Sequence, residues 1–122
     1  SNEEQLNDNV SYMEQFEPLS GGERETVKKA VDILNSLPTI PCTGCKYCVD
    51  GCPQHINIPE IFTAMNDLTL YNNAEGSKAA YGRTVKEGGK ASDCIQCGAC
   101  ESHCPQHIGI IETLKKAAAQ FE

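Results

Sequence analysis

The feature that most constrains this chain is a run of four cysteines that occurs twice. The first run has cysteines at positions 42, 45, 48 and 52 and the second at 94, 97, 100 and 104, so a shift of fifty-two residues brings one onto the other. Each run continues with Pro-Gln-His-Ile, at residues 53–56 and 105–108. The two runs contain all eight cysteines of the 122-residue chain. Two copies of one loop–helix unit predict a pseudo-two-fold arrangement in which each copy completes the other's site.

The spacing within each run, C-x2-C-x2-C-x3-C-P, is the one that bacterial ferredoxins use to bind iron–sulfur clusters. Three closely spaced thiolates wrap one side of a cubane cluster, and the fourth, turned away by the following Pro, reaches the other cluster. The sequence therefore predicts two 4Fe–4S clusters with crossed ligands. Cluster 1 takes Cys42, Cys45, Cys48 and Cys104, and cluster 2 takes Cys94, Cys97, Cys100 and Cys52.

Zinc and disulfides are the alternatives for a small chain rich in cysteine. Structural zinc usually takes two separated C-x2-C pairs, whereas here a third cysteine follows each pair at once. No apolar stretch resembles a signal peptide or is long enough to cross a membrane, so we expect a cytoplasmic location, where disulfides are rare. Iron–sulfur clusters are favoured, and zinc stays open because soft thiolates accept either metal.

The charge of the chain limits its partners. The formal net charge is −7, with ten Lys and Arg against seventeen Asp and Glu. This balance argues against nucleic acid and favours protein partners that carry a basic patch.

Apolar residues at helical spacing predict an all-α fold, and no segment alternates as a strand does. Residues 1–19 are expected to form an N-terminal tail or connector, and residues 20–122 a helical ferredoxin-like domain with two cluster-binding loops. A capping box between Ser20 and Glu23 opens its first helix, which Pro38 and Pro41 end.

Three further helices are expected. The first has Pro59 in its first turn and carries an apolar stripe to Leu68, before a break at residues 72–73. The second runs from about Ala74 or Ser77 to Lys86, with Gly88-Gly89 ending it. The third carries the stripe Ile110, Ile111, Leu114, Ala117, Ala118 and Phe121.

Some residues near the cysteines suggest further roles. Gly44, Gly51 and Gly98 allow the backbone to approach a cluster, although glycines in tight loops often serve only as turn residues. For His55 and His107, we expect that they cap the loop, and coupling of electron transfer to protons is the alternative.

Other polar and aromatic residues receive structural roles. Tyr47 is expected to cover an edge of the core, with packing over cluster 1 as the alternative. Glu60 and Glu112 suit the first turns of helices, where a carboxylate interacts well with the dipole. His103 receives no role. No nucleophile–base pair, phosphate-binding loop or carboxylate dyad occurs in a convincing context, so no catalytic residue is predicted.

Short sequence motifs around the cysteines resemble those of a known protein family. With Pro-Cys-Thr-Gly-Cys at residues 41–45, Ala-Ser-Asp-Cys at 91–94 and Pro-Leu-Ser at 18–20, the chain resembles the C-terminal ferredoxin-like part of iron–sulfur aldo/keto reductase family proteins over residues 16–122. The resemblance implies an α-helical ferredoxin fold, which the long helical insert between the runs also favours. It implies a partner too, because an N-terminal (β/α)8 barrel in such proteins holds the catalytic Asp, Tyr, Lys and His and binds a nicotinamide cofactor. That barrel is not in this sequence.

These observations lead us to expect electron transfer through two 4Fe–4S clusters, in the ferredoxin-like module of an aldo/keto reductase-type oxidoreductase. The expected partner is the missing barrel or a docked redox protein, and neither nucleic acid nor a membrane is expected. The alternative is a structural metal-binding module, with zinc or clusters, that stabilises or mediates assembly with a catalytic partner.

Overall fold

The computed structural model describes residues 2–14 and 16–122, and these residues form helices joined by loops. Among them there is no strand, and a single parallel bridge joins Ile56 to Gly89. The predicted all-α fold is thus confirmed. The chain divides into two compact units, Ser1–Leu37 and Pro38–Glu122, each of which is described by itself.

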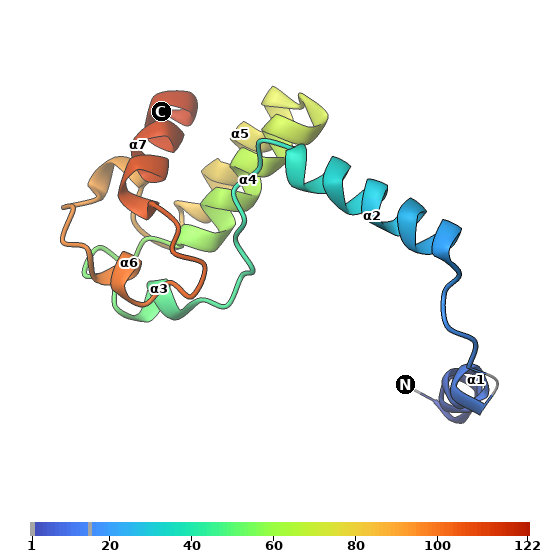
Figure 1. Ribbon diagram of the computed structural model, residues 1–122. Helices are drawn as coiled ribbons and strands as arrows, with labels where there is room; N and C mark the ends of the chain where they lie inside the picture. The colour runs from blue at the N-terminus through green and yellow to red at the C-terminus, as the bar shows by residue number, and fades with distance from the viewer. Residues whose placement is uncertain (1, 15) are drawn as a thin grey trace. The chain divides into compact units, whose positions relative to one another are not determined.

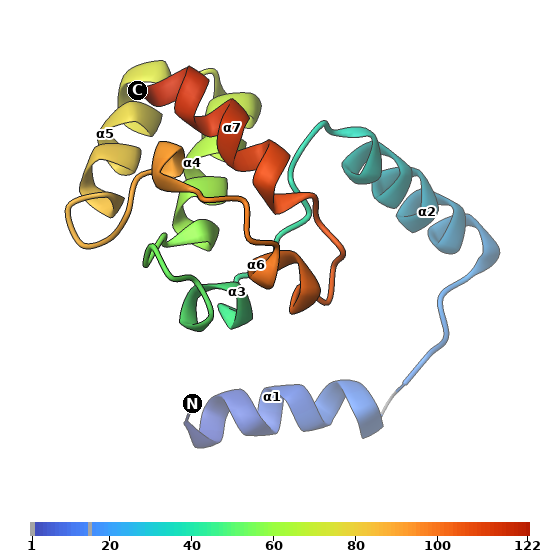
Figure 2. The ribbon, with the colours of Figure 1, turned by 90° about the vertical axis from the view of Figure 1, so that its left-hand side faces the viewer.

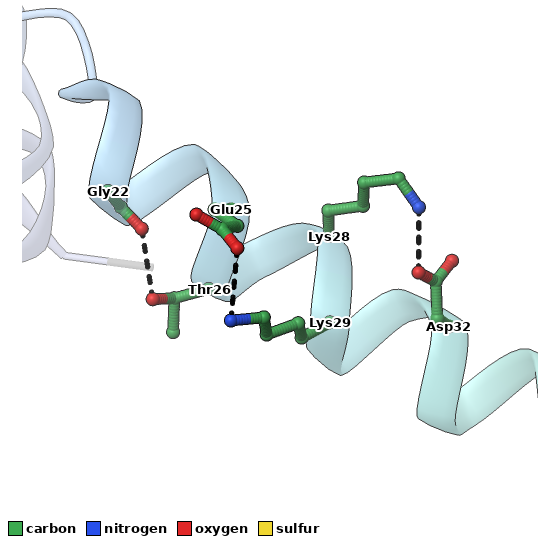
Figure 3. A network of polar contacts seen from close by, with 6 residues as sticks. All are labelled: Gly22, Glu25, Thr26, Lys28, Lys29 and Asp32. Carbon is green, nitrogen blue, oxygen red and sulfur yellow. Dashed lines mark hydrogen bonds and ion pairs between the residues drawn. The ribbon is translucent and has the colours of Figure 1, made fainter.

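The first unit contains α1 (Glu3–Glu14) and α2 (Gly21–Ser36). The predicted capping box is present, because Ser20 Oγ accepts the amide of Glu23 and the Glu23 carboxylate accepts the amide of Ser20. On the exposed surface of α2, Lys28 pairs with Asp32 at 2.7 Å and Lys29 with Glu25 at 3.1 Å (Figure 3). Exposed pairs at this spacing stabilise a helix only by about 0.3–0.5 kcal/mol each.

The boundary between the two units falls one helix later than the sequence predicts. We expected residue 20 to open the cysteine-containing domain, whereas α2 belongs with the N-terminal unit and the second unit begins at Pro38. Pro38 and Pro41 keep the segment after α2 extended, since proline restricts both its own backbone and that of the preceding residue. The two prolines were expected to end this helix, and α2 ends at Ser36, two residues before Pro38. In the sequence they lie between α2 and the first cysteine, Cys42.

The second unit contains the remaining elements. They are α3 (Tyr47–Asp50), α4 (Ile58–Tyr71), α5 (Ala74–Thr84), the 3-10 helix η1 (Ala91–Asp93), α6 (Ala99–Ser102) and α7 (Ile110–Phe121). The internal repeat is visible in this order: α3 and α6, and likewise α4 and α7, begin fifty-two residues apart. The short helices α3 and α6 lie against one another at one end, and α4 packs on α5 and α7 at the other (Figures 1 and 2).

The core of this unit lies where α4 and α7 meet the cysteine loops. Its fully buried side chains include two equivalent pairs from α4 and α7, Ile58 with Ile110 and Phe62 with Leu114. Ile56 and Ile61 are also fully buried. Two buried cysteines, Cys48 and Cys100, belong to the same cluster of side chains. Each run of cysteines therefore contributes one buried cysteine to the core.

The junctions of α4 and α5 follow the sequence closely. Pro59 lies in the first turn of α4, Asn72 ends the helix in the left-handed conformation, and the side chain of Asn73 caps the start of α5. Helix α5 ends at Thr84, two residues before the predicted Lys86.

The two glycines at residues 88 and 89 do not end α5 as predicted. A Cβ atom on Gly88 would lie 2.4 Å from the carbonyl oxygen of His55, and one on Gly89 would lie 2.3 Å from that of Gln54. Both glycines let the chain pass against the segment that follows Cys52, where the Gly89 amide donates to the carbonyl of His55 at 3.1 Å. Their role is close approach between distant segments.

Candidate metal centre

Two cavities lie in the second unit, and each is lined by four cysteines. The wall of cavity A includes Cys42, Cys45, Cys48 and Cys104. The wall of cavity B includes Cys94, Cys97, Cys100 and Cys52. Each cavity thus combines three cysteines of one run with the fourth cysteine of the other, and all eight cysteines are free thiols.

The two cavities are near copies of one another. Their volumes, counting the open mouths, are about 330 Å³ for cavity A and about 320 Å³ for cavity B. Apolar residues line equivalent places: Phe62 and Ile108 in cavity A correspond to Leu114 and Ile56 in cavity B. Ile58 lines both cavities and is fully buried between them. The fold therefore presents two equal sites separated by an aliphatic side chain.

The cysteine loops share an unusual backbone. Positive φ angles occur at Gly44 (68°) and Lys46 (66°) in the first loop and at the equivalent Gln96 (57°) and Gly98 (78°) in the second. In each loop only one of the two left-handed residues is a glycine. The other is Lys46 in the first loop and Gln96 in the second, each with a long side chain. Alternating left-handed residues turn successive amides inward and make a concave site that suits an anion.

The amides of both loops are available to such an anion. The Cys42 and Cys94 amides donate to the carbonyls of Ile40 and Ala91, at 2.8 and 3.3 Å. Within the described chain, the next five amides of each loop, at residues 43–47 and 95–99, donate to no protein atom. A cluster ligated by four thiolates is anionic, and hydrogen bonds to its sulfurs help to set its reduction potential.

Each loop is anchored two residues before its first cysteine. Asn66 of α4 exchanges two hydrogen bonds with the backbone of Ile40, at 2.8 and 2.9 Å. At the equivalent position of the second copy, Ser92 donates to Glu122 through its amide at 3.1 Å and through its hydroxyl at 2.5 Å. The helices α4 and α7 thus hold the cysteine loops through different side chains.

Tyr81 connects this second anchor to the core. Its hydroxyl donates to Glu122 and accepts the buried amide of Ala91 at 2.9 Å, while its ring stacks on Phe121 with centroids 5.0 Å apart. Burial, followed by the hydrogen bond to Glu122, raises the pKa of Tyr81 to about 12. Burial also acts to raise the pKa of Glu122, but the hydrogen bonds from Ser92 and Tyr81 outweigh it and the pKa is lowered. The pair is therefore a neutral phenol beside a carboxylate.

The innermost thiols are protonated in the metal-free protein at neutral pH. Burial raises the pKa of Cys48 to about 11, and repulsion from Cys42, Cys100 and Cys45 adds to this effect. Burial, then the charge of Glu101, raises the pKa of Cys100. Metal ligation needs thiolates, so loading of these sites releases protons.

The histidines and Tyr47 differ from what we expected. Among the described residues, the side chains of His55 and His107 donate no hydrogen bond, and both residues have positive φ angles, 52° and 51°. They act through a left-handed backbone, which histidine adopts more readily than most residues, and not through a capping side chain. Tyr47 is 62% exposed and covers no edge of the core, and it does not line cavity A.

The other secondary predictions have mixed outcomes. Gly44 and Gly98 have positive φ angles, which glycine adopts more easily than other residues, but Gly51 has an ordinary φ of −89°. Glu60 and Glu112 lie in the first turns of α4 and α7, as predicted. His103, given no role, lines cavity A and places Nδ1 2.7 Å from the carbonyl of Ala99.

Sequence reasoning missed Asn66, Tyr81, Glu101 and Glu122. Glu101 accepts the amide of Ile111 at 2.9 Å and so caps the first turn of α7. No motif marks these four residues. Asn66, Glu101 and Glu122 each have a different residue type at the equivalent position of the other copy, and Tyr81 lies in α5, between the two copies. Their roles depend on contacts between segments distant in sequence.

The donor set fits clusters better than single ions. Among residues 2–14 and 16–122, no three or more His, Cys, Asp or Glu side chains form a site for one metal ion. The thiols are divided between the two cavities, four to each. Four thiols, an apolar wall and free loop amides at each cavity suit a 4Fe–4S cluster.

Comparison with known proteins agrees with this geometry. Residues 41–108, more than half of the chain, match the family model described as the 4Fe–4S dicluster domain. No curated protein and no solved structure matches the chain. The family match makes no link to aldo/keto reductases. In the described part of the chain, no helix has the length and apolar character to cross a bilayer. The chain belongs to the 4Fe–4S dicluster domain family, and its eight cysteines fit two 4Fe–4S clusters.

Proposed function

We propose that this protein transfers single electrons through two 4Fe–4S clusters, one in each cavity. The observation that carries the proposal is that the fold makes two equivalent four-cysteine cavities with only the buried side chain of Ile58 shared between them. One cluster is enough to hold a small fold together, whereas two adjacent sites of equal construction allow an electron to pass from one to the other. A bound 4Fe–4S cluster supplies a centre that gains or loses one electron without breaking a bond.

The ligand sets are also a proposal. Cys42, Cys45, Cys48 and Cys104 would hold cluster 1 in cavity A, and Cys94, Cys97, Cys100 and Cys52 would hold cluster 2 in cavity B. The linings of the two cavities support this crossed assignment. The hydrogen bonds around each fourth cysteine also match between copies: the Cys52 and Cys104 amides donate to Val49 and Glu101, at 3.0 and 3.2 Å.

Exposure of the loops supports a role in transfer between proteins. Cys45 and Cys97 are exposed, whereas Cys48 and Cys100 are buried. Each cavity thus has an inner end toward its counterpart and an outer end at the surface. A one-electron donor, such as a reduced flavin or another iron–sulfur protein, loses the electron at one surface and an acceptor gains it at the other.

The wider context that we propose is an oxidoreductase of the aldo/keto reductase type. The support is the likeness of the flanking sequence words, Pro-Cys-Thr-Gly-Cys and Ala-Ser-Asp-Cys, to the ferredoxin-like part of such proteins. In that context the partner would be a catalytic barrel, and this chain would supply its electrons. An independent electron carrier with a docked redox partner is the other form of the same function.

Anaerobic spectroscopy tests the proposed function. The reconstituted chain is expected to bind about eight iron and eight sulfide per molecule and to show a broad visible absorption that dithionite bleaches. Replacing Cys45 and Cys97 together by Ser is expected to lower the iron content, and a Ser11→Ala variant serves as a control outside the cavities. A colourless protein that binds two zinc ions and keeps its fold would instead support the structural role.

A further inference from the structure

The two cavities are built from equivalent positions of the two copies. Residues that differ at these positions therefore give the two cavities different polarity and charge. Lys46 lines cavity A, and the equivalent residue in cavity B is Gly98. Thr43 in cavity A corresponds to Ile95 in cavity B. His103 also lines cavity A. Both cavities also include a glutamine at the equivalent positions 54 and 106. Cavity A therefore has a more polar wall than cavity B and includes a cation.

A carboxylate next to cavity B increases this difference. Glu101 follows Cys100 directly in α6, and the equivalent residue beside Cys48 is Val49. The Glu101 carboxylate is half-buried and is held in place by the amide of Ile111 at 2.9 Å. Ile111 itself lines cavity B, so the carboxylate lies against the wall of that cavity. Negative charge at cavity B is thus opposed by a fixed anion that cavity A lacks.

The other charged residues nearby do not reverse this order. Asp50 and Asp93 are exposed, and one lies next to each cysteine loop. Lys46 also lines a polar groove together with Arg83, Glu60 and Glu87. Of these four residues only Lys46 lines cavity A itself. Beside cavity B, Lys115 lines a groove that shares Cys94 and Ile111 with the cavity, and its charge is paired with Glu112 at 2.6 Å. Lys46, in the wall of cavity A, and Glu101, bonded to the wall of cavity B, remain as the charges that distinguish the two cavities.

We propose that cavity A, with Lys46 in its wall, is the site that takes up the first electron, and that cavity B, next to Glu101, is the site of lower reduction potential. Uptake of an electron makes a cluster more negative, so a nearby cation favours it and a nearby carboxylate opposes it. An external one-electron donor is oxidised and one cluster is reduced, and no proton or bond changes place. The inference rests on the proposed function and adds a direction of transfer, from cavity B to cavity A.

An anaerobic redox titration of the two-cluster protein, followed by electron paramagnetic resonance, tests the proposal. The wild type is expected to show two one-electron steps at different potentials. Lys46→Gly gives cavity A the residue of cavity B, and Gly tolerates the φ of 66° at this position. This variant is expected to lower the potential of the upper step and to leave the lower step in place.

A second variant tests the other charge. Glu101→Gln keeps an oxygen that accepts the Ile111 amide and removes the negative charge, so it is expected to raise the lower step alone. The double variant is expected to bring the two steps together. Lys46→Arg, which keeps the charge, and Lys78→Gln, which removes one from the exposed surface of α5, are expected to move neither step.

The possible outcomes separate this inference from the proposed function. A protein that binds two clusters of equal potential, or in which Lys46→Gly moves the lower step, overturns the assignment and leaves electron transfer intact. Iron and sulfide assays before the titration detect a chain that binds no cluster, which overturns both. Should Lys46→Gly lose iron, Lys46→Gln is titrated in its place and the same shift is expected.

Discussion

Single residues in this protein carry out the same backbone task with different side chains. In the first loop Gly44 and Lys46 are left-handed, and in the second Gln96 and Gly98 are. A left-handed backbone is costly for most residues, so two long side chains are held in it by the surrounding loop. The positions follow the repeat, although the residue types do not. The two copies therefore share the left-handed backbone at these two positions, although the side chains there differ.

The crossed ligand assignment can be tested at the residue scale by double substitutions. Cys52→Ala is expected to remove the cluster of cavity B and to leave about half of the iron, because the cluster loses one of four ligands. Adding Cys94→Ala should then cost little more iron, since both residues serve the same cluster. Adding Cys42→Ala to Cys52→Ala should remove nearly all of it. Iron assays of the reconstituted variants give the readout.

The mirror-image variants provide the control for this experiment. Cys104→Ala with Cys42→Ala is expected to keep about half of the iron, and Cys104→Ala with Cys94→Ala almost none. The reverse pattern in both series would show that each run holds its own cluster.

At the scale of elements, helices position the loops through polar anchors. Asn66 of α4 holds Ile40, and Glu122 at the end of α7 holds Ser92, each two residues before a first cysteine. The second anchor also includes Tyr81 of α5, so three elements meet just before Cys94. The register of α7 is thus coupled to the position of the second cysteine loop.

Tyr81→Phe is expected to weaken the second loop selectively. The change leaves the buried amide of Ala91 without an acceptor, which costs about 1–3 kcal/mol. Heating the two-cluster protein while following its visible absorption should show the earlier loss of one half of the colour. Tyr71→Phe, at a residue 73% exposed on α4, is the matched control and should change stability by less than about 0.5 kcal/mol. Equal loss of colour from both sites in Tyr81→Phe would contradict a local anchor.

At the scale of the molecule, the core of the second unit is arranged around its two cavities. Ile58 faces both of them, and Phe62 and Leu114 form equivalent walls. When a cluster is removed, the apolar side chains of the cavity wall lose the van der Waals contacts that they made with it. Bound metal also contributes directly to the folding free energy of small domains. The clusters are thus expected to stabilise the second unit as well as to carry electrons.

Removal of iron is expected to destabilise the second unit without affecting the helix α2. In peptide-resolved hydrogen exchange, amides of α4 and α7 should exchange at least about tenfold faster after chelation, the change that about 1.4 kcal/mol of lost stability gives. Amides of α2, in the other unit, are the internal control and should not change. Unchanged protection of α4 and α7 would show that the protein alone maintains the cavities.

The sequence by itself determined the cofactor, the helical class and the repeat, because cysteine spacing and apolar periodicity are local properties of a chain. It also placed the capping box at Ser20 and the break at Asn72, where short-range hydrogen bonds decide the outcome. Only the tertiary structure decided that Gly88 and Gly89 serve close approach, that α2 lies outside the cysteine-containing unit, and that Asn66 and Glu122 anchor the loops. Those features depend on segments far apart in sequence, whose meeting no local pattern encodes.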